Sequence, residues 1–322
     1  MKRIFSLILC LILAAGFAGP QPAAAAEEAP LRIVTTIFPL FDWTRELLGD
    51  RAESTELTML LDSGVDLHSY QPTVDDIVKI SACDLFIYVG GESDAWAEDV
   101  LREAANPDLR VLDLMDVLGG AVKEEETVEG MEDEDEEGDP GETEYDEHIW
   151  LSLRNARVCC AAIAQALAEL DPGQAALYQE NAAVYDEKLA ALDETFAAAL
   201  ESADYDTLLF GDRFPFRYLT DDYQLKYYAA FSGCSAETEA SFETIAFLAA
   251  KADELHLPAI LTIEGTDRRI AQTIAENTNA PDRRILTLNS LQSVTAAEVR
   301  AGVTYLGILE DDLAVLVQAL ND

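Results

Sequence analysis

The stretch QAALYQENAAVYDEKLAALDETFAAALES, residues 174–202, decides the fold. Its apolar residues recur at helical spacing, and no Gly or Pro interrupts it after Asp171-Pro172-Gly173. We therefore expect one long amphipathic helix over residues 172–203. The apolar positions that define its buried face are Leu177, Val184, Tyr185, Leu189, Leu192 and Phe196.

Apolar, β-branched runs alternate with helical patterns on both sides of this helix. The runs before it are LRIVTTIF, ELTMLL, DLFIYVGG and RVLDL, and those after it are DTLLF, LKYYAAF, PAILTIE and RRILTLN. Strands separated by helices predict parallel sheets flanked by helices. We expect an α/β fold with two parallel-sheet domains, 27–171 and 204–322. The helix would join them as a rigid backbone, and a ligand site would lie in the cleft between them.

The first 26 residues have the pattern of a secretory signal peptide. Lys2 and Arg3 precede an apolar run, and Ala24-Ala25-Ala26 offers a small-residue cleavage site. An uncleaved anchor is one alternative. Lipid modification of Cys10 is another, and the bulky Leu9 before it disfavours that reading. We predict an exported protein of the periplasm or the cell surface.

The chain is strongly acidic, with 62 Asp and Glu against 21 Lys and Arg and a formal net charge of −41. Loss of Lys2 and Arg3 with the leader makes it more negative still. Nucleic acids and anionic membranes repel such a surface, so neither is an expected partner. The charge suits a soluble exported protein that handles cations.

Four cysteines follow the leader, and their spacing forms neither a disulfide framework nor a CxxC zinc pair. We expect buried free thiols. They are Cys83, Cys159, Cys160 and Cys234.

An acidic insert, residues 123–145, interrupts the first domain. It has few apolar residues, many like charges, Gly and Pro, so we expect disorder. Carboxylates bind calcium, magnesium or manganese loosely. The insert is therefore interpreted either as a device that enriches divalent cations locally or as a solvated spacer.

Two of the three histidines are candidate metal ligands. His68 follows the run ELTMLL, and ligands of parallel sheets gather beyond the carboxyl ends of strands. His148 ends the acidic insert, just before Ile149 and Trp150, which we expect to anchor it in the folded domain. His256 stands at the start of a strand, so we interpret it as a surface loop residue.

Asp212, Glu264 and Asn289 each follow a strand of the second domain. Two domains that face each other could bring these oxygens to the two histidines. Two imidazoles with carboxylate oxygens suit Zn²⁺, and Mn²⁺ if oxygens dominate. A carboxylate at a strand end can equally cap a helix.

Three motifs in order carry a family resemblance: SGVDLHSYQPTVDDI, DEHIWLSLRNA and, after the long helix, GDRFPFRYL. In this order and separation they resemble the zinc/manganese-type (ZnuA-like) solute-binding proteins of metal ABC transporters. The resemblance covers nearly all of the chain after the leader. It implies a protein that holds a divalent metal between two α/β domains and hands it to a membrane permease. No reaction is implied, and we expect a monomer.

Carried over by motif, His68 and His148 match the family's first two ligands. Gly211 stands where the third ligand is usually His or Glu, with Asp212 beside it. Asn289 stands where the fourth is usually Asp. The resemblance therefore leaves Asp212, Glu264, Asn289, Asp66 or water to complete the shell.

The sequence favours a receptor that captures Zn²⁺, or Mn²⁺, for an importer. One alternative is a receptor for another small ligand, such as an anion, with Arg213 and Asn289 as contacts. In the metal receptor, Arg213 would instead pair with Asp212 or Glu264. A zinc-dependent hydrolase is the other alternative, but the chain has neither HExxH nor GxSxG. Cell adhesion is considered only as a property of the family.

Overall fold

Two parallel four-stranded sheets organise the computed structural model, which describes residues 30–131, 144–233 and 239–321. The first sheet contains β1 (Arg32–Thr35), β2 (Glu56–Met59), β3 (Leu85–Tyr88) and β4 (Arg110–Asp113). The second contains β5 (Thr207–Phe214), β6 (Lys226–Ser232), β7 (Ala259–Ile263) and β8 (Arg284–Leu288). The spatial orders are β2-β1-β3-β4 and β6-β5-β7-β8, so the two sheets share one topology. We call the parts built on them the N-terminal lobe and the C-terminal lobe.

The expected fold, two parallel-sheet α/β domains with a long helix, is confirmed. By its contacts, Leu31–Asp322 forms one compact unit that includes both sheets. The domain boundaries at 171/172 and 203/204 therefore stay a prediction. The leader, residues 1–26, lies outside the described residues.

Helices follow the strands as the sequence predicts, and several begin at side-chain caps. Thr73 and Asp76 form a reciprocal capping box on α2, and the Ser152 hydroxyl accepts from the Asn155 N–H at the start of α5. The helices of the N-terminal lobe are α1 (Phe38–Leu48), α2 (Val74–Ala82), α3 (Trp96–Arg102), α4 (Leu114–Leu118) and α5 (Leu153–Leu170). Those that follow are α6 (Ala175–Glu201), α7 (Arg217–Tyr223), α8 (Phe242–Glu254), α9 (Arg269–Glu276), α10 (Ala296–Arg300) and α11 (Tyr305–Ala319).

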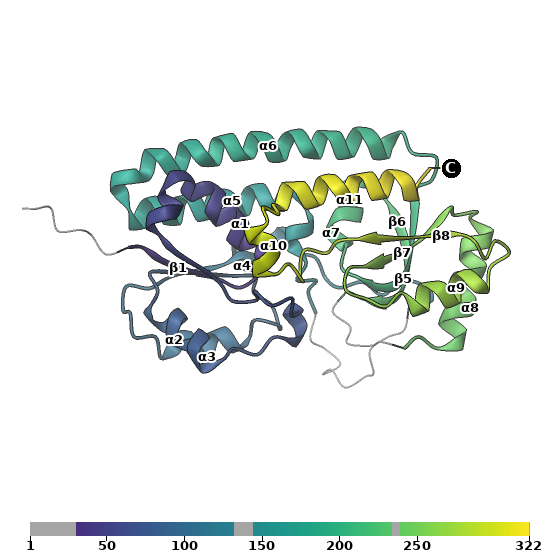
Figure 1. The fold of residues 1–322 in the computed structure, drawn as a ribbon, viewed down its shortest axis with the longest axis horizontal. Helices are drawn as coiled ribbons and strands as arrows, with labels where there is room; N and C mark the ends of the chain where they lie inside the picture. Colours follow the sequence, from purple (N-terminus) through teal and green to yellow (C-terminus); the bar gives the residue numbers. More distant parts are fainter. Residues whose placement is uncertain (1–29, 132–143, 234–238, 322) are drawn as a thin grey trace, which may run out of the picture. The chain divides into compact units, whose positions relative to one another are not determined.

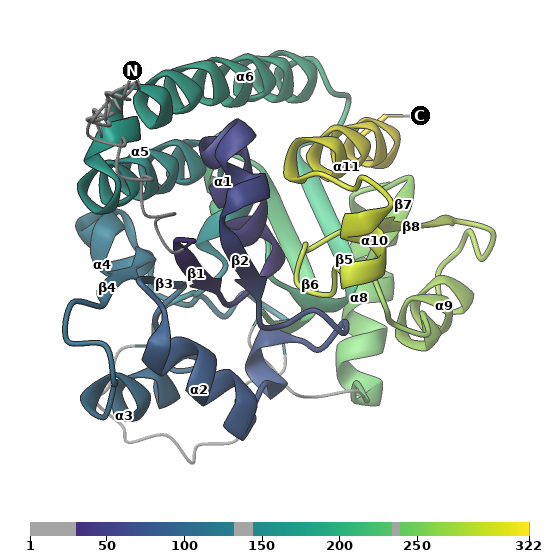
Figure 2. The same ribbon diagram turned by 60° about the vertical axis from the view of Figure 1, so that its left-hand side comes forward.

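The long helix α6 runs for 27 residues between the two lobes. It packs on α5, α1 and α11, and Figures 1 and 2 both show it beside α5 and α11. Leu189, Leu192 and Phe196 are buried as expected, whereas Val184 is exposed. Tyr178 and Leu200 extend the buried face to both ends of the helix. One helix therefore contributes to the packing of both lobes.

One local difference from the sequence-based expectation affects the site. Strand β5 continues to Phe214, four residues beyond the run DTLLF, so Asp212 and Arg213 lie within the strand and not after it. Near the C-terminus, Gly302 separates α10 from α11, and its φ of 94° favours glycine.

The two described ends of the acidic insert are ordered, unlike the disorder that composition predicted. Glu124 and Tyr145 form an antiparallel bridge. The Lys123 N–H donates to the Tyr218 hydroxyl on α7, and Glu126 pairs with Arg217 at 3.2 Å. Contacts with α7 of the C-terminal lobe thus hold the first end of the insert, and the bridge joins the second end to the first. Its middle, residues 132–143, lies outside the described residues.

Cys83, Cys159 and Cys160 are buried free thiols, as expected, and Cys234 lies outside the described residues. Burial raises the pKa of the Cys83 and Cys159 thiols to about 12. These two thiols are therefore protonated near neutral pH and belong to the core. Among the residues that the structure describes, no helix combines the length and hydrophobicity that a membrane crossing needs.

Candidate metal site

His68 lies on a single helical turn, Leu67–Ser69, that follows β2. Asp66 caps this turn, because its Oδ1 accepts the His68 N–H at 3.0 Å. The His68 side chain is 11% exposed. Burial, the neighbouring His148 and the positive charge of Arg213 lower the pKa of His68 to about 3, although Asp66 opposes this. A neutral imidazole, the form that binds metals, is therefore favoured at His68.

His148 is fully buried at the start of another short turn, Ile149–Leu151. Asp146 holds it twice, because its Oδ1 lies 2.8 Å from the His148 backbone N and 3.0 Å from Nδ1. Burial alone would lower the pKa of His148, but the charge and hydrogen bond of Asp146 outweigh it and raise the pKa. The bond to Asp146 fixes a proton on Nδ1 and turns Nε2 away from the carboxylate.

Trp150 anchors the turn that carries His148, as the sequence predicted. Its indole Nε1–H donates to the Ser290 carbonyl of the C-terminal lobe at 2.8 Å. The Tyr305 hydroxyl of α11 donates to the Trp150 carbonyl at 2.6 Å. His148 thus stands on a segment before α5 that two hydrogen bonds tie to the C-terminal lobe.

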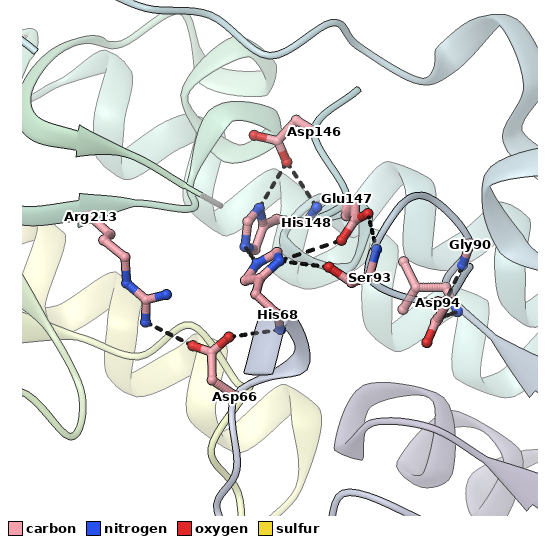
Figure 3. Close-up of polar contacts among 10 residues, drawn as sticks. Asp66, His68, Gly90, Ser93, Asp94, Asp146, Glu147, His148 and Arg213 are labelled. Atoms are coloured by element: carbon pink, nitrogen blue, oxygen red, sulfur yellow. Dashed lines mark hydrogen bonds and ion pairs between the residues drawn. The ribbon is translucent and has the colours of Figure 1, made fainter. Parts of the chain in front are cut away.

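The two imidazoles meet nitrogen to nitrogen (Figure 3). His68 Nε2 lies 3.1 Å from His148 Nε2, and the rings are tilted by 56°. Two nitrogens bound tetrahedrally to one zinc ion at about 2.0–2.1 Å would lie about 3.3–3.4 Å apart. The pair is therefore close to the spacing that one shared ion requires.

The three candidates from the C-terminal lobe are engaged elsewhere. Asp212 accepts from the Thr266 hydroxyl at 2.8 Å and the Ile263 N–H at 3.2 Å through Oδ2, and from the Arg213 N–H through Oδ1. Burial raises its pKa, although these hydrogen bonds oppose the shift. Both oxygens of Asp212 therefore serve the C-terminal lobe's own loop.

Glu264 and Asn289 also bond within the C-terminal lobe. The two Glu264 oxygens accept from the Ser290 N–H and hydroxyl, each at 2.7 Å. Burial raises the Glu264 pKa. Asn289 Oδ1 accepts from the Leu291 N–H at 2.8 Å. Within the described residues, no group of three or more His, Cys, Asp and Glu side chains converges as a metal site.

Arg213 is the residue of β5 that reaches the N-terminal lobe (Figure 3). Its Nη2 lies 2.7 Å from Asp66 Oδ2, so the ion pair is with Asp66 and not with Asp212 or Glu264. Both side chains are about one-fifth exposed, at 19% and 20%. Burial would raise the pKa of Asp66, but Arg213 and His68 outweigh it and lower the pKa.

Sequence reasoning also missed Ser93 and Glu147. Ser93 Oγ lies 2.8 Å and Glu147 Oε2 lies 3.5 Å from His68 Nδ1. The sequence contains the tripeptide Asp146-Glu147-His148, but the tripeptide alone does not predict that Glu147 faces His68. His256 is an exposed loop residue, as predicted.

Comparisons with known proteins point to a family of zinc-uptake components. A family model described as "ZnuA: Zinc-uptake complex component A periplasmic" matches residues 33–319. "Zinc-binding lipoprotein AdcA" of Streptococcus pneumoniae is 29% identical over 327 residues, which is 100% of this chain and 62% of that protein. "High-affinity zinc uptake system protein ZnuA" of Bacillus subtilis is 27% identical over 323 residues, 98% of this chain and 97% of that protein. The chain thus spans about three-fifths of the first curated relatives it matches.

Solved structures share the fold. The Zn(II)-bound ZnuA-like domain of S. pneumoniae AdcA has a TM-score of 0.71 and 26% identity, covering 91% of this chain and 100% of that one. The laminin-binding protein Lmb of Streptococcus agalactiae, described as bifunctional with adhesin and metal-transporting activity, has a TM-score of 0.73 and 26% identity, with the same coverage.

Proposed function

We propose a metal-capturing role for this chain, which belongs to the ZnuA family of zinc-uptake components. It would capture Zn²⁺ outside the cytoplasm and deliver it to the membrane permease of an ABC importer. The observation that carries the proposal is the 3.1 Å contact between an imidazole nitrogen of His68 and one of the fully buried His148. Zinc is favoured over Mn²⁺ because imidazole nitrogens suit zinc, whereas manganese prefers oxygen ligands.

His68 and His148 are the proposed ligands. Asp212, Glu264 and Asn289 remain candidates for the open positions, with water as the alternative. Each would have to exchange its present hydrogen bonds for a metal bond. The names of the relatives support zinc as cargo, since AdcA is a zinc-binding lipoprotein and the B. subtilis protein a zinc-uptake component.

The rival functions gain less support. An anionic ligand would need a guanidinium that can face it, and Arg213 is paired with Asp66. Hydrolysis would need a general base at an open metal position, and Asp212 and Glu264 accept local hydrogen bonds instead. We therefore propose capture and release without catalysis, by a monomer at the extracytoplasmic face. Adhesion is a property of Lmb that we do not extend to this chain.

Thermal unfolding of residues 27–322 in a zinc titration tests the proposal. Ligand at 100 times its Kd stabilises by about 2.7 kcal/mol, which raises Tm by about 5 °C in a chain of this size. His148→Ala should abolish the rise, and His256→Ala is the matched control because that histidine is exposed in a loop. No rise with zinc or manganese, or an equal loss in both variants, would overturn the proposed function.

A further inference from the structure

Glu147 is a buried carboxylate with one oxygen that lacks a hydrogen bond. Its side chain is 3% exposed, and Oε1 accepts the Ser93 N–H at 2.8 Å. Oε2 has no hydrogen-bond partner within the described residues and lies 3.5 Å from His68 Nδ1. An unsatisfied buried acceptor is destabilising, and more so when it is charged. Such an oxygen beside a candidate ligand calls for a functional explanation.

The loop after β3 is shaped to hold this carboxylate (Figure 3). Gly91 has a φ of 78°, and a Cβ on it would lie 2.3 Å from Glu147 Oε1. The next turn is fixed by Asp94, whose Oδ2 accepts the N–H groups of Val89 and Gly90 at 2.9 and 3.3 Å. Glycine at position 91 thus makes room for Glu147, and Asp94 keeps the loop in place around it.

The two histidines have matching surroundings. His148 Nδ1 faces the carboxylate of Asp146 at 3.0 Å, and His68 Nδ1 faces Ser93 Oγ and the carboxylate of Glu147. Two consecutive acidic residues thus each face the Nδ1 atom of one histidine. Asp146 faces His148 on its own segment, and Glu147 faces His68 across the site. In both rings the Nδ1 side is occupied, and the Nε2 atoms face each other.

We propose that Glu147 is the positioning residue of His68. Its negative charge, 3.5 Å from Nδ1, favours a proton on that nitrogen and so keeps the Nε2 lone pair directed at the zinc cargo. This inference rests on the proposed function. The oxygen that lacks a partner would accept the Nδ1–H directly when the loaded ion draws electron density from the ring. Carboxylates behind metal-bound histidines raise ligand basicity in this way.

Glu147→Gln tests the proposal, because it keeps the shape and removes the charge. We expect zinc affinity, measured by competition with a chromophoric chelator, to fall about 10-fold to 100-fold. Glu92→Gln is the matched control, since it removes an exposed carboxylate from the same loop. Its affinity should stay within about twofold of wild type, as is usual for an exposed charge.

Two further readouts separate positioning from a merely structural role. Nitrogen-15 NMR of the loaded protein should show the His68 Nδ1–H tautomer in wild type and Glu92→Gln, and a changed Nδ1 signal in Glu147→Gln. Unloaded Glu147→Gln should melt no lower than wild type, because it removes a buried charge. A lower Tm with unchanged affinity would overturn the proposal.

The outcomes distinguish this inference from the proposed function. If wild type binds zinc and Glu147→Gln binds it equally tightly, only the role of Glu147 is overturned. If wild type and Glu92→Gln both fail to bind zinc, the proposed function fails and the role of Glu147 falls with it.

Discussion

Replacing Arg213 should strengthen cation binding. Arg213→Met removes the positive charge nearest to Asp66 and keeps much of the side-chain volume. A guanidinium and a divalent ion roughly 10 Å apart repel each other by on the order of 3 kcal/mol at an effective dielectric constant of about 20. Salt at about 0.15 M would reduce this to about 1 kcal/mol for fully exposed charges, and would screen it less for the largely buried Arg213. We therefore expect zinc to bind at least about fivefold more tightly.

Without zinc, Arg213→Met should be less stable than wild type. Its Asp66 would keep the hydrogen bond from the His68 N–H but lose the ion pair that joins the two lobes. Breaking a largely buried pair is destabilising, here by about 1–3 kcal/mol because both groups are part-exposed. Zinc should restore part of this loss, so the zinc-induced rise in Tm should be larger than in wild type.

Competition titrations at two salt concentrations measure the effect. Arg213→Lys keeps the charge and should bind like wild type. Arg217→Met removes another arginine of the C-terminal lobe, one that pairs with Glu126 and Asp221, and should leave affinity unchanged. Weaker zinc binding by Arg213→Met would refute the electrostatic reasoning.

Three other predictions follow from the described contacts. Two Nε2 atoms in contact need one proton between them, and zinc must displace it, so zinc binding near pH 7 should release about one proton. Calorimetry in buffers of different ionisation enthalpy measures this release. No release would contradict a proton shared between the two Nε2 atoms. Tyr218→Phe removes the hydroxyl that donates to the Asp146 carbonyl at 2.7 Å. Urea denaturation should show an unfolding free energy lower by about 1 kcal/mol. An unchanged urea midpoint would count against that hydrogen bond. Burial raises the pKa of Asp94 to about 7, so its ionisation costs stability, and the cost appears as pH rises from about 4 to 7. Asp94→Asn should therefore show a smaller fall in unfolding free energy than wild type across that window, and parallel curves would refute this.

The fold was largely predictable because its signals are local. Alternating strands and helices fix the parallel sheets, and the uninterrupted helical pattern fixes α6. The rule that ligands gather at the carboxyl ends of parallel strands marked His68, which follows β2, as a candidate ligand. Helix starts at cap residues such as Thr73 and Ser152 are local in the same way, because capping depends on neighbouring backbone groups.

The surroundings of the histidines could not be predicted in the same way. Successive residues of a strand face opposite sides of the sheet. Because β5 extends through Asp212 and Arg213, Arg213 reaches Asp66 of the N-terminal lobe and Asp212 bonds within the C-terminal lobe. That Glu147 serves His68 depends on how the loop at Gly91 folds around it. The ends of the insert are ordered by partners about 90 residues away, such as Tyr218, which composition does not reveal.

Zinc K-edge X-ray absorption of the loaded protein tests the central claim most directly. Wild type should show two imidazole ligands with nitrogen at about 2.0–2.1 Å from the ion. His68→Ala and His148→Ala should each lose one imidazole contribution, and His256→Ala should keep both. A zinc spectrum without imidazole scattering, or one unchanged in His148→Ala, would contradict the assignment of His68 and His148 as the ligands that capture the metal.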